Sequence, residues 1–378
     1  MGTTVTILRN LERAGIAGGA DAVETAEVDK AELLELRRDP EVRAVAPVMP
    51  TQLIRPLEGG PEAATSDAAW GVKAVGADVS ARTGRGVPVA VLDTGIDASH
   101  PAFKGVELVQ EDFSGDGLGD KNGHGTHCAG TVFGQDVDGT RIGVARGVRK
   151  AFIGKVLTDD GGGDTDMLVR GLQWAVLNEA RVISMSIGYD FPGFVRMLIE
   201  RDYEPDLATS MALESYRANL RLFDAFMGMV DARAAFGPGA LVVAAAGNES
   251  HREKRPDYEL GVSLPAASEG VLSVGALEQE DGALRVADFS NTFPLVSAPG
   301  VEVLSARTGG GLFRLSGTSM ATPHVAGVAA LWWEHLTETA APVKADHVRT
   351  EILAAADTSR LAGGVDAADR GAGLARCP

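Results

Sequence analysis

The sequence predicts an α/β fold: a doubly wound, mostly parallel sheet with helices on both faces, preceded by a small α+β segment. Two patterns indicate the sheet. Several short runs are apolar almost without interruption, as in parallel strands covered on both faces, and helical stretches separate them along the chain. The predicted strands are 88–92, 150–156, 181–186, 241–245 and 271–274, and the predicted helices include 166–178 and 209–234.

Composition and charge narrow the classes of protein that the chain can be. Of its 378 residues, 45% are hydrophobic and 23% are charged, which fits a folded α/β protein rather than a disordered chain. The net charge of −17 argues against a nucleic-acid binder and against attachment to an anionic membrane surface. No run approaches the ~18 apolar residues of a membrane span. We therefore expect neither nucleic acid nor a membrane among the partners.

Two features bear on the compartment. Cys128 and Cys377 are too few for a disulfide framework and do not indicate a redox environment. The first twenty residues carry Arg9, Glu12 and Arg13 where a secretory signal needs an unbroken apolar run. We favour a cytoplasmic protein, with a secreted protein whose leader was removed as the alternative.

Residues 1–62 are predicted to form a separate N-terminal unit. Its predicted elements are strands at 4–8, 22–28 and 42–48 and a helix at 31–38. Residues 50–67, which contain Gly59-Gly60-Pro61, are typical of a linker. Residues 63–378 are predicted to form the second domain, with an enlarged insertion at about 189–236.

The predicted helix in this insertion carries two apolar rows. The first row is Leu213, Tyr216, Leu220, Phe223, Met227 and Val230, and the second is Leu222, Phe226 and Met229. An ordinary buried face explains the first row. Because both rows together are wider than docking onto one sheet requires, we expect Leu222 and Phe226 to contact the N-terminal unit. The preceding residues 189–206 are expected to form a loop.

Three segments carry side chains that together suit nucleophilic catalysis. A serine hydroxyl is a weak nucleophile, so it needs a base to take its proton and a carboxylate to orient that base. Asp93 ends the run Val89-Ala-Val-Leu-Asp93, where open α/β sheets keep their sites. His124 lies in Asn122-Gly-His124-Gly-Thr-His127-Cys, among small residues, and Ser319 begins a predicted helix in Gly-Thr-Ser319-Met-Ala-Thr-Pro323.

A fourth segment supplies a hydrogen-bond donor. In Ala244-Ala-Ala-Gly-Asn248, an amide side chain follows the end of a predicted strand. Such an amide can donate to the negative oxygen that develops when a nucleophile attacks a carbonyl group.

These residues also fit other kinds of site. Asp-Thr-Gly also marks aspartic proteases, but those need two such motifs and this chain has one. His124, His127 and Cys128 could be metal ligands at helical spacing, although no fourth ligand stands in a matching motif. His127 and His324 are expected to be packed helix residues, since one base suffices.

The four motifs, in this order, resemble the subtilisin-like serine proteases (subtilases), over about Trp70 to Leu374. The resemblance implies that Asp93 orients His124, that His124 is general base and then general acid, that Ser319 is the nucleophile, and that Asn248 is the oxyanion donor. It implies two segments that hold an extended substrate as an added strand, namely Gly161, Gly162 and Gly163 and Ser186, Ile187 and Gly188. It also implies that Ala245, Ala246 and Gly247 wall the pocket for the residue before the cleaved bond.

The resemblance extends to the N-terminal unit and to metal. The helix-then-strand pattern at 31–48 is similar to a shortened inhibitory propeptide, with residues 51–58 entering the cleft as an extended strand; an inert extension is the alternative. No cofactor is implied for catalysis. Many members hold structural calcium, and the candidate ligands are Asp112, Asp116, Asp120, Asp136 and Asp138. Ordinary solvated loop acids explain these five residues equally well.

Three functional classes follow. The leading one is a serine endopeptidase that hydrolyses extended polypeptides through an acyl-enzyme. The others are a catalytically silent binding module on the same fold and a peptide ligase that transfers the acyl group. A catalytically silent module would not need a complete set of catalytic side chains, and this chain retains all four, namely Asp93, His124, Asn248 and Ser319.

Overall fold

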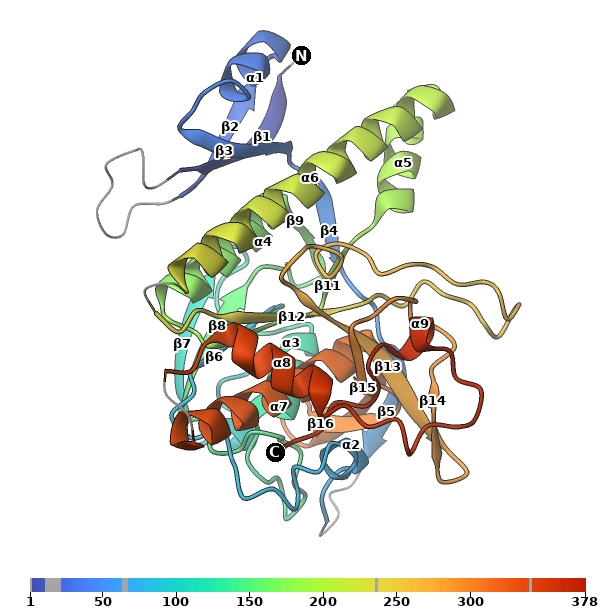
Figure 1. Cartoon of the computed structure of the whole chain (residues 1–378). Helices are drawn as coiled ribbons and strands as arrows, with labels where there is room; N and C mark the ends of the chain where they lie inside the picture. The colour runs from blue at the N-terminus through green and yellow to red at the C-terminus, as the bar shows by residue number, and fades with distance from the viewer. Residues whose placement is uncertain (1, 11–21, 63–66, 235–236, 340–341) are drawn as a thin grey trace.

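The computed structural model describes residues 2–10, 22–62, 67–234, 237–339 and 342–378. Figure 1 shows a small N-terminal unit that stands on a larger α/β domain, with one long helix between the two. Within the described residues, no helix is both long and apolar enough to cross a bilayer.

The N-terminal unit is a three-stranded antiparallel sheet with one helix. The sheet has the order β2-β1-β3, and Val5, Ile7 and Val28 form its small core. Asp29 caps the helix, because its carboxylate accepts from the amides of Ala31 and Glu32. The bounds are β1 (Thr3–Arg9), β2 (Val23–Val28), α1 (Lys30–Leu36) and β3 (Val42–Pro47).

The second domain is built on an eight-stranded sheet. Its order is β14-β13-β12-β10-β6-β8-β7, with β15 also paired to β13. All these pairings are parallel except that of β13 with β14. The bounds are β6 (Val89–Asp93), β7 (Glu107–Asp112), β8 (Lys150–Lys155), β10 (Val182–Met185), β12 (Leu241–Ala245), β13 (Leu272–Glu280), β14 (Ala283–Val286) and β15 (Val296–Pro299).

Helices cover both faces of this sheet, which confirms the predicted fold class. Alternate residues of β6 enter two different cores: Val89 and Val91 face the helices α3, α7 and α8, whereas Ala90 and Leu92 face α4 and α6. Helix α7 runs through the core, and a Cβ on Gly327 would lie 2.5 Å from Val144 Cβ. The bounds are α3 (His124–Phe133), α4 (Thr165–Leu177), α6 (Pro205–Arg233), α7 (Thr318–Thr339) and α8 (Ala345–Ala354); smaller helices are α2 (Trp70–Ala74), a 3-10 turn (Pro101–Phe103) and α9 (Ala367–Arg370).

The prediction of a linker at 50–67 is wrong for most of these residues, because two strands form there. β4 (Pro50–Leu53) lies between β9 (Gly162–Asp164) and β11 (Ile187–Tyr189), and β5 (Leu57–Glu62) pairs with β17 (Leu312–Ser316), which continues to β16 (Val303–Ala306). Glycine and proline hide the strand tendency, and the strands exist because distant edges of the second domain supply their hydrogen-bond partners. Residues 63–66, with the predicted domain boundary, lie outside the described residues.

The insertion is a helical hairpin rather than a loop followed by a helix. Residues predicted as a loop contain α5 (Phe191–Glu200), which packs on the start of α6 through Leu198, Ala208 and Ala212. Pro205 occupies the first turn of α6, where a missing amide hydrogen costs nothing. The long helix lies along β3, and Arg43 Nε donates to the Ala225 carbonyl at 3.2 Å.

The two apolar rows of α6 are only partly buried as expected. Leu213, at the start of the first row, is 45% exposed, because the N-terminal turns of α6 project beyond the sheet and contact α5. Leu222 and Phe226 are buried, in a cluster that includes Leu8 and Ala46 of the N-terminal unit.

Candidate active site

Asp93 and His124 form a buried pair at the end of β6. Asp93 is the last residue of that strand and His124 the first of α3, and His124 Nδ1 lies 2.8 Å from Asp93 Oδ1. The same oxygen accepts from the Thr94 amide at 2.8 Å. Because Nδ1 bonds the carboxylate, Nε2 is the ring nitrogen left for proton transfer.

The electrostatics favour a protonated imidazole at this position. Burial by itself lowers the pKa of His124, but the charge of Asp93, the neighbouring Cys128 and the hydrogen bond to Asp93 outweigh it and leave the pKa well above the ordinary value. Asp93 Oδ2 is buried without a hydrogen-bond partner in the described part of the chain. The hydrogen bonds from His124 and from the Thr94 amide therefore both reach Oδ1 of this carboxylate.

Cys128 lies one helical turn after His124 and belongs to the same buried group. Its Sγ is 3.7 Å from His124 Nδ1 and 3.5 Å from the Ser319 carbonyl oxygen, to which the thiol donates. Burial raises the pKa of Cys128, so the residue packs there as a neutral thiol.

The metal interpretation of His124, His127 and Cys128 does not hold. His127 Nε2 points away from that group and donates to the carbonyls of Val303 and Phe313 at 3.0 and 3.1 Å. Among the described residues, the one group of three such side chains with ligand atoms within 4.8 Å of one another is Asp93, His124 and Cys128. Burial also lowers the pKa of His127 to about 3 and that of His324 to about 4, which fits packed neutral rings.

Ser319 and Asn248 each donate a hydrogen bond to the backbone just after β4. Ser319, in the first turn of α7, is buried, and its hydroxyl donates to the Ile54 carbonyl at 3.1 Å. Asn248 Nδ2 donates to the next carbonyl, that of Arg55, at 3.1 Å. Thr318 fixes the amide, because its backbone N–H and its hydroxyl both donate to Asn248 Oδ1 at 2.8 Å.

The two glycine-containing segments hold β4 between them as a middle strand. Thr51, Gln52 and Leu53 pair antiparallel with Tyr189, Gly188 and Ile187 on one side. On the other side Thr51 and Gln52 pair with Gly163 and Gly162, and the Leu53 amide donates to the Gly161 carbonyl at 2.8 Å. Five of the six residues predicted to bind a strand therefore contact β4.

Of the remaining predicted residues, Ser186 and Gly247 contact the serine motif, and Ala245 and Ala246 are buried. Ser186 does not bond the strand; its hydroxyl donates to the Ser319 carbonyl at 3.2 Å. Ala245 and Ala246 are buried behind the site, and Gly247 has the positive φ of 114° that places its amide near Thr318 Oγ1. A Cβ on Gly188 would lie 3.2 Å from Ile54 Cγ1, so Ile54 occupies the space against this strand.

The cleft continues beyond Pro56. A hollow of about 500 Å³ adjoins His124 and His127. Leu53, Arg55 and Pro56 form part of its lining, together with Lys121, Asn122 and Phe313 of the second domain. Past this hollow the chain continues as β5 against β17. Residues 51–62 thus pair first with β9 and β11 and then with β17.

The five acidic residues predicted to bind calcium are not brought together. Asp120 is buried and accepts from Thr94 Oγ1 and from the amides of Gly123 and Thr126. Asp112 accepts from three amides of its own loop, at Ser114, Gly115 and Gly117.

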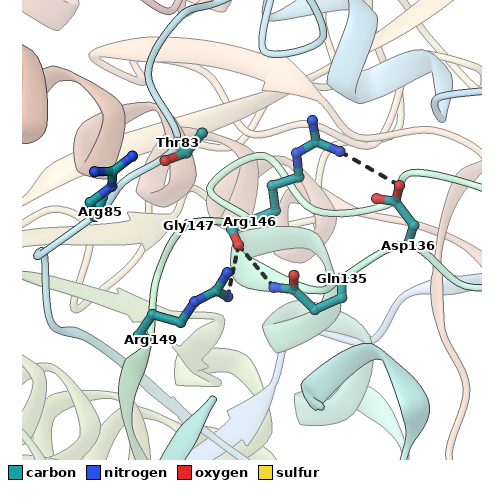
Figure 2. Close-up of a pocket in the computed structure, with 7 residues that line it drawn as sticks. All are labelled: Thr83, Arg85, Gln135, Asp136, Arg146, Gly147 and Arg149. Carbon is teal, nitrogen blue, oxygen red and sulfur yellow. Dashed lines mark hydrogen bonds and ion pairs between the residues drawn. The ribbon is translucent and has the colours of Figure 1, made fainter. Parts of the chain in front are cut away.

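The other three acids have different surroundings. Asp116 accepts from the Asp159 amide at 2.8 Å, and Asp138 stands in a turn with φ 46°. Asp136 pairs with Arg146 at 3.5 Å in a separate hollow of about 710 Å³ that also contains Arg85 and Arg149 (Figure 2). These residues do not fit one shared calcium site.

Comparison with known proteins agrees with this geometry. The fold and the grouped aspartate, histidine, serine and asparagine define a serine hydrolase of the subtilisin type. The model of the subtilase family, Peptidase_S8, matches residues 84–374, and the chain belongs to that family.

Two relatives are named as proteases. The thermostable alkaline protease of Halalkalibacterium halodurans is 34% identical over 315 residues, which are 81% of this chain and 71% of the relative. The intracellular serine protease of Paenibacillus polymyxa is 38% identical over 254 residues, 66% of this chain and 67% of that protein. The chain is a serine endopeptidase; neither the silent binding module nor the peptide ligase is favoured.

A solved structure supports the fold. The chain superposes on fervidolysin from Fervidobacterium pennivorans, described as a keratinolytic enzyme related to subtilisin, with a TM-score of 0.71 and 22% identity. All of this chain is covered, and it spans 60% of the length of fervidolysin. At this identity the likeness shows that the two chains share a fold.

Several residues at the site were not identified from the sequence. Thr318 stands in the serine motif, but its role in orienting Asn248 depends on β12 and α7 meeting. Thr165, Tyr189 and Asn219 form a buried hydrogen-bonded group that bonds the chain just before β4. A signal for Asn219 was present, since it is a polar residue inside the apolar stripe of α6.

Proposed function

We propose that the chain is the self-inhibited form of this endopeptidase, with Ser319 as nucleophile, His124 as base, Asp93 as its orienting group and Asn248 as oxyanion donor. The observation that carries the proposal is the path of residues 51–56. β4 fills the place of an added strand, and the carbonyls of the next two residues, Ile54 and Arg55, accept hydrogen bonds from Ser319 and Asn248. The ligand class implied for the cleft is an extended polypeptide.

The mechanism follows from the positions of four groups. Ser319 Oγ attacks the carbonyl carbon of a bound peptide while His124 Nε2 takes the hydroxyl proton, and the C–O bond forms as the carbonyl π electrons move to oxygen. Asn248 Nδ2 donates to that oxygen. His124 then protonates the leaving amine, the C–N bond breaks, and water repeats the sequence on the acyl-enzyme.

The same geometry supports inhibition rather than cleavage of the chain's own segment. A productive carbonyl must offer its carbon to Ser319 and its oxygen to Asn248 at once. Here two successive carbonyls divide these contacts, because Ser319 donates to Ile54 and Asn248 donates to Arg55. Ser319 is also not hydrogen-bonded to His124 among the described contacts. The segment therefore fills the cleft in a register that does not favour attack.

The inhibition can be tested in the full chain by weakening β4. Leu53 and Ile54 are buried in the cleft, whereas Leu57 is 61% exposed. Leu53→Glu with Ile54→Glu places two unpaired charges in buried positions, so the segment should leave the cleft and hydrolysis of a short chromogenic peptide should rise more than tenfold. Leu57→Glu is the matched control and should change little.

A second measurement separates inhibition from a general effect on folding. After folding, the segment is released by a specific protease at a site introduced within residues 63–66, and activity is followed as the segment is added back in trans. Activity should rise on release and fall on addition. Equal activity at every stage would show that the segment is an inert extension.

A further inference from the structure

A buried polar group on the second domain bonds the backbone of the N-terminal unit just upstream of β4. Asn219 of α6 and Thr165 at the start of α4 are fully buried, and Tyr189 at the end of β11 is 5% exposed. The group forms hydrogen bonds with the backbone of Pro47 and Met49, which lie seven and five residues before Ile54.

The hydrogen bonds at this point are made to main-chain atoms. The Met49 amide donates to Thr165 Oγ1 at 3.1 Å, and the Thr165 amide donates to the Met49 carbonyl at 3.1 Å. Asn219 Nδ2 donates to the Pro47 carbonyl at 3.0 Å. No bond of this group uses a side chain of the bound segment, so the recognition does not depend on its sequence.

The remaining bonds hold the three side chains in position. Thr165 Oγ1 donates to Asn219 Oδ1 at 2.8 Å, and the Tyr189 hydroxyl donates to Thr165 Oγ1 at 3.1 Å. Asn219 Nδ2 uses its second hydrogen on the Ser215 carbonyl of its own helix at 2.9 Å. Withdrawal of the segment therefore leaves buried donors on Asn219 and Thr165 without protein partners, a state that costs free energy until another acceptor arrives.

We infer that Thr165, Asn219 and Tyr189 form a backbone-binding subsite for a polypeptide, upstream of the cleft that β9 and β11 form. The chain's own Pro47–Met49 occupies it in the inhibited form. A substrate that reaches back to the eighth residue before the cleaved bond occupies it afterwards, counted as if that bond followed Ile54, with an apolar side chain at the sixth residue, where Met49 is buried. This inference rests on the proposed inhibition. It means that the insertion helix α6 contacts the part of a substrate that takes the place of residues 47–49.

The insertion explains why the subsite exists. Asn219 belongs to α6, and this helix lies between the N-terminal unit and the second domain (Figure 1). Thr165 and Tyr189 adjoin the two segments that flank β4, since Thr165 follows β9 and Tyr189 ends β11. The subsite therefore continues the cleft toward the N-terminal end of a bound substrate strand.

The first test measures the chain's own segment in the full-length protein. Thr165→Val removes the hydroxyl at nearly constant volume, and Thr165→Ser retains it as the matched control. Hydrogen exchange of the Met49 amide should become about tenfold faster in Thr165→Val and stay near the parent value in Thr165→Ser. Asn219→Ala provides a second variant, with Thr209→Ala on the same helix as its control, because Thr209 is exposed and its Oγ1 donates to the Pro205 carbonyl of the same helix. Unchanged Met49 exchange in both test variants would refute the subsite.

The second test measures substrates after the folded chain has been freed of its segment by specific cleavage. Two peptides share the residues around the cleaved bond, and one has eight residues before that bond whereas the other has three. In the parent the longer peptide should have a kcat/KM about tenfold higher, mainly through KM, and Thr165→Val should remove this preference while Thr165→Ser keeps it. Equal kcat/KM for both peptides in the parent would overturn the substrate subsite. If release of the segment raises activity on neither peptide, the proposed inhibition fails instead, while Met49 exchange still tests the subsite.

Discussion

His127 gives a quantitative prediction, because its two ring nitrogens have unequal surroundings. Nε2 donates to the Val303 and Phe313 carbonyls, while Nδ1 is buried without a partner among the described residues. Burial first, and then the charge of His124, lower the pKa of His127 from 6.5 to about 3. Protonation would add a positive charge and an N–H at Nδ1, and no described residue accepts a hydrogen bond from that nitrogen.

The sign of the pH effect follows from linkage. Below pH 6.5 the unfolded chain binds a proton at His127 that the folded chain refuses until about pH 3, so stability is lost as the pH falls through this window. The loss is about 1.4 kcal/mol per pH unit, and between pH 7.5 and 5.0 it reaches about 2 kcal/mol from this residue.

The assay compares His127→Gln with the parent by urea unfolding at both pH values. Glutamine keeps an amide donor near the position of Nε2 and does not titrate, so the variant should lose about 2 kcal/mol less than the parent between pH 7.5 and 5.0. His347→Gln, at an exposed position, is the control and should follow the parent. Other titrating groups cancel in this difference. If His127→Gln and the parent lose equal stability, the buried neutral imidazole is wrong.

Three further predictions concern catalysis. Ser319→Ala should lower kcat on a chromogenic peptide by on the order of 10⁶, a magnitude measured for subtilisin itself; near-normal turnover would refute the nucleophile. Asn248→Ala should lower kcat by about 10²–10³ with little change in KM, as for the subtilisin asparagine, and a change in KM alone would make it a binding residue. Because the pKa of His124 is raised, and the neutral ring is the base, kcat/KM should rise with pH through a midpoint above the ordinary histidine range. A profile that is flat from pH 5 to 9 would contradict a histidine base.

The central strands, and the places of the candidate catalytic residues on them, could be predicted from the sequence because their signals are local. β12 spans the predicted residues 241–245, since a strand covered on both faces must be apolar throughout. Asp93 ends such a strand, and Ser319 begins a helix whose small residues allow it to cross the core. Each side chain's place depends on its own segment, and parallel strands bring their carboxyl ends to one edge of the sheet.

The path through the cleft depended on the tertiary structure. No local pattern in Pro50–Leu53 or Leu57–Glu62 marks a strand, because their partners are edges more than a hundred residues away. The extended strand predicted at 51–58 came only from the resemblance to a propeptide. The register that divides the Ile54 and Arg55 carbonyls between Ser319 and Asn248 is set by those pairings. A one-residue shift would change both contacts, and no local pattern fixes it.

Within the insertion, helix α6 also has features that the local sequence predicts and features that only the tertiary structure decides. The apolar period of α6 is local and predicts the helix, but Leu213 is exposed and Asn219 buried, against the polarity of both. Which turns of α6 face α5, β3 or the sheet is decided by where the helix lies in the folded molecule. The sequence alone determined the chemistry that Asp93, His124, Asn248 and Ser319 can perform. Only the packing of α6 against β3, α4 and β11 decided that Asn219 and Thr165 bond a backbone, because hydrogen bonds between residues this far apart exist only once the chain has folded.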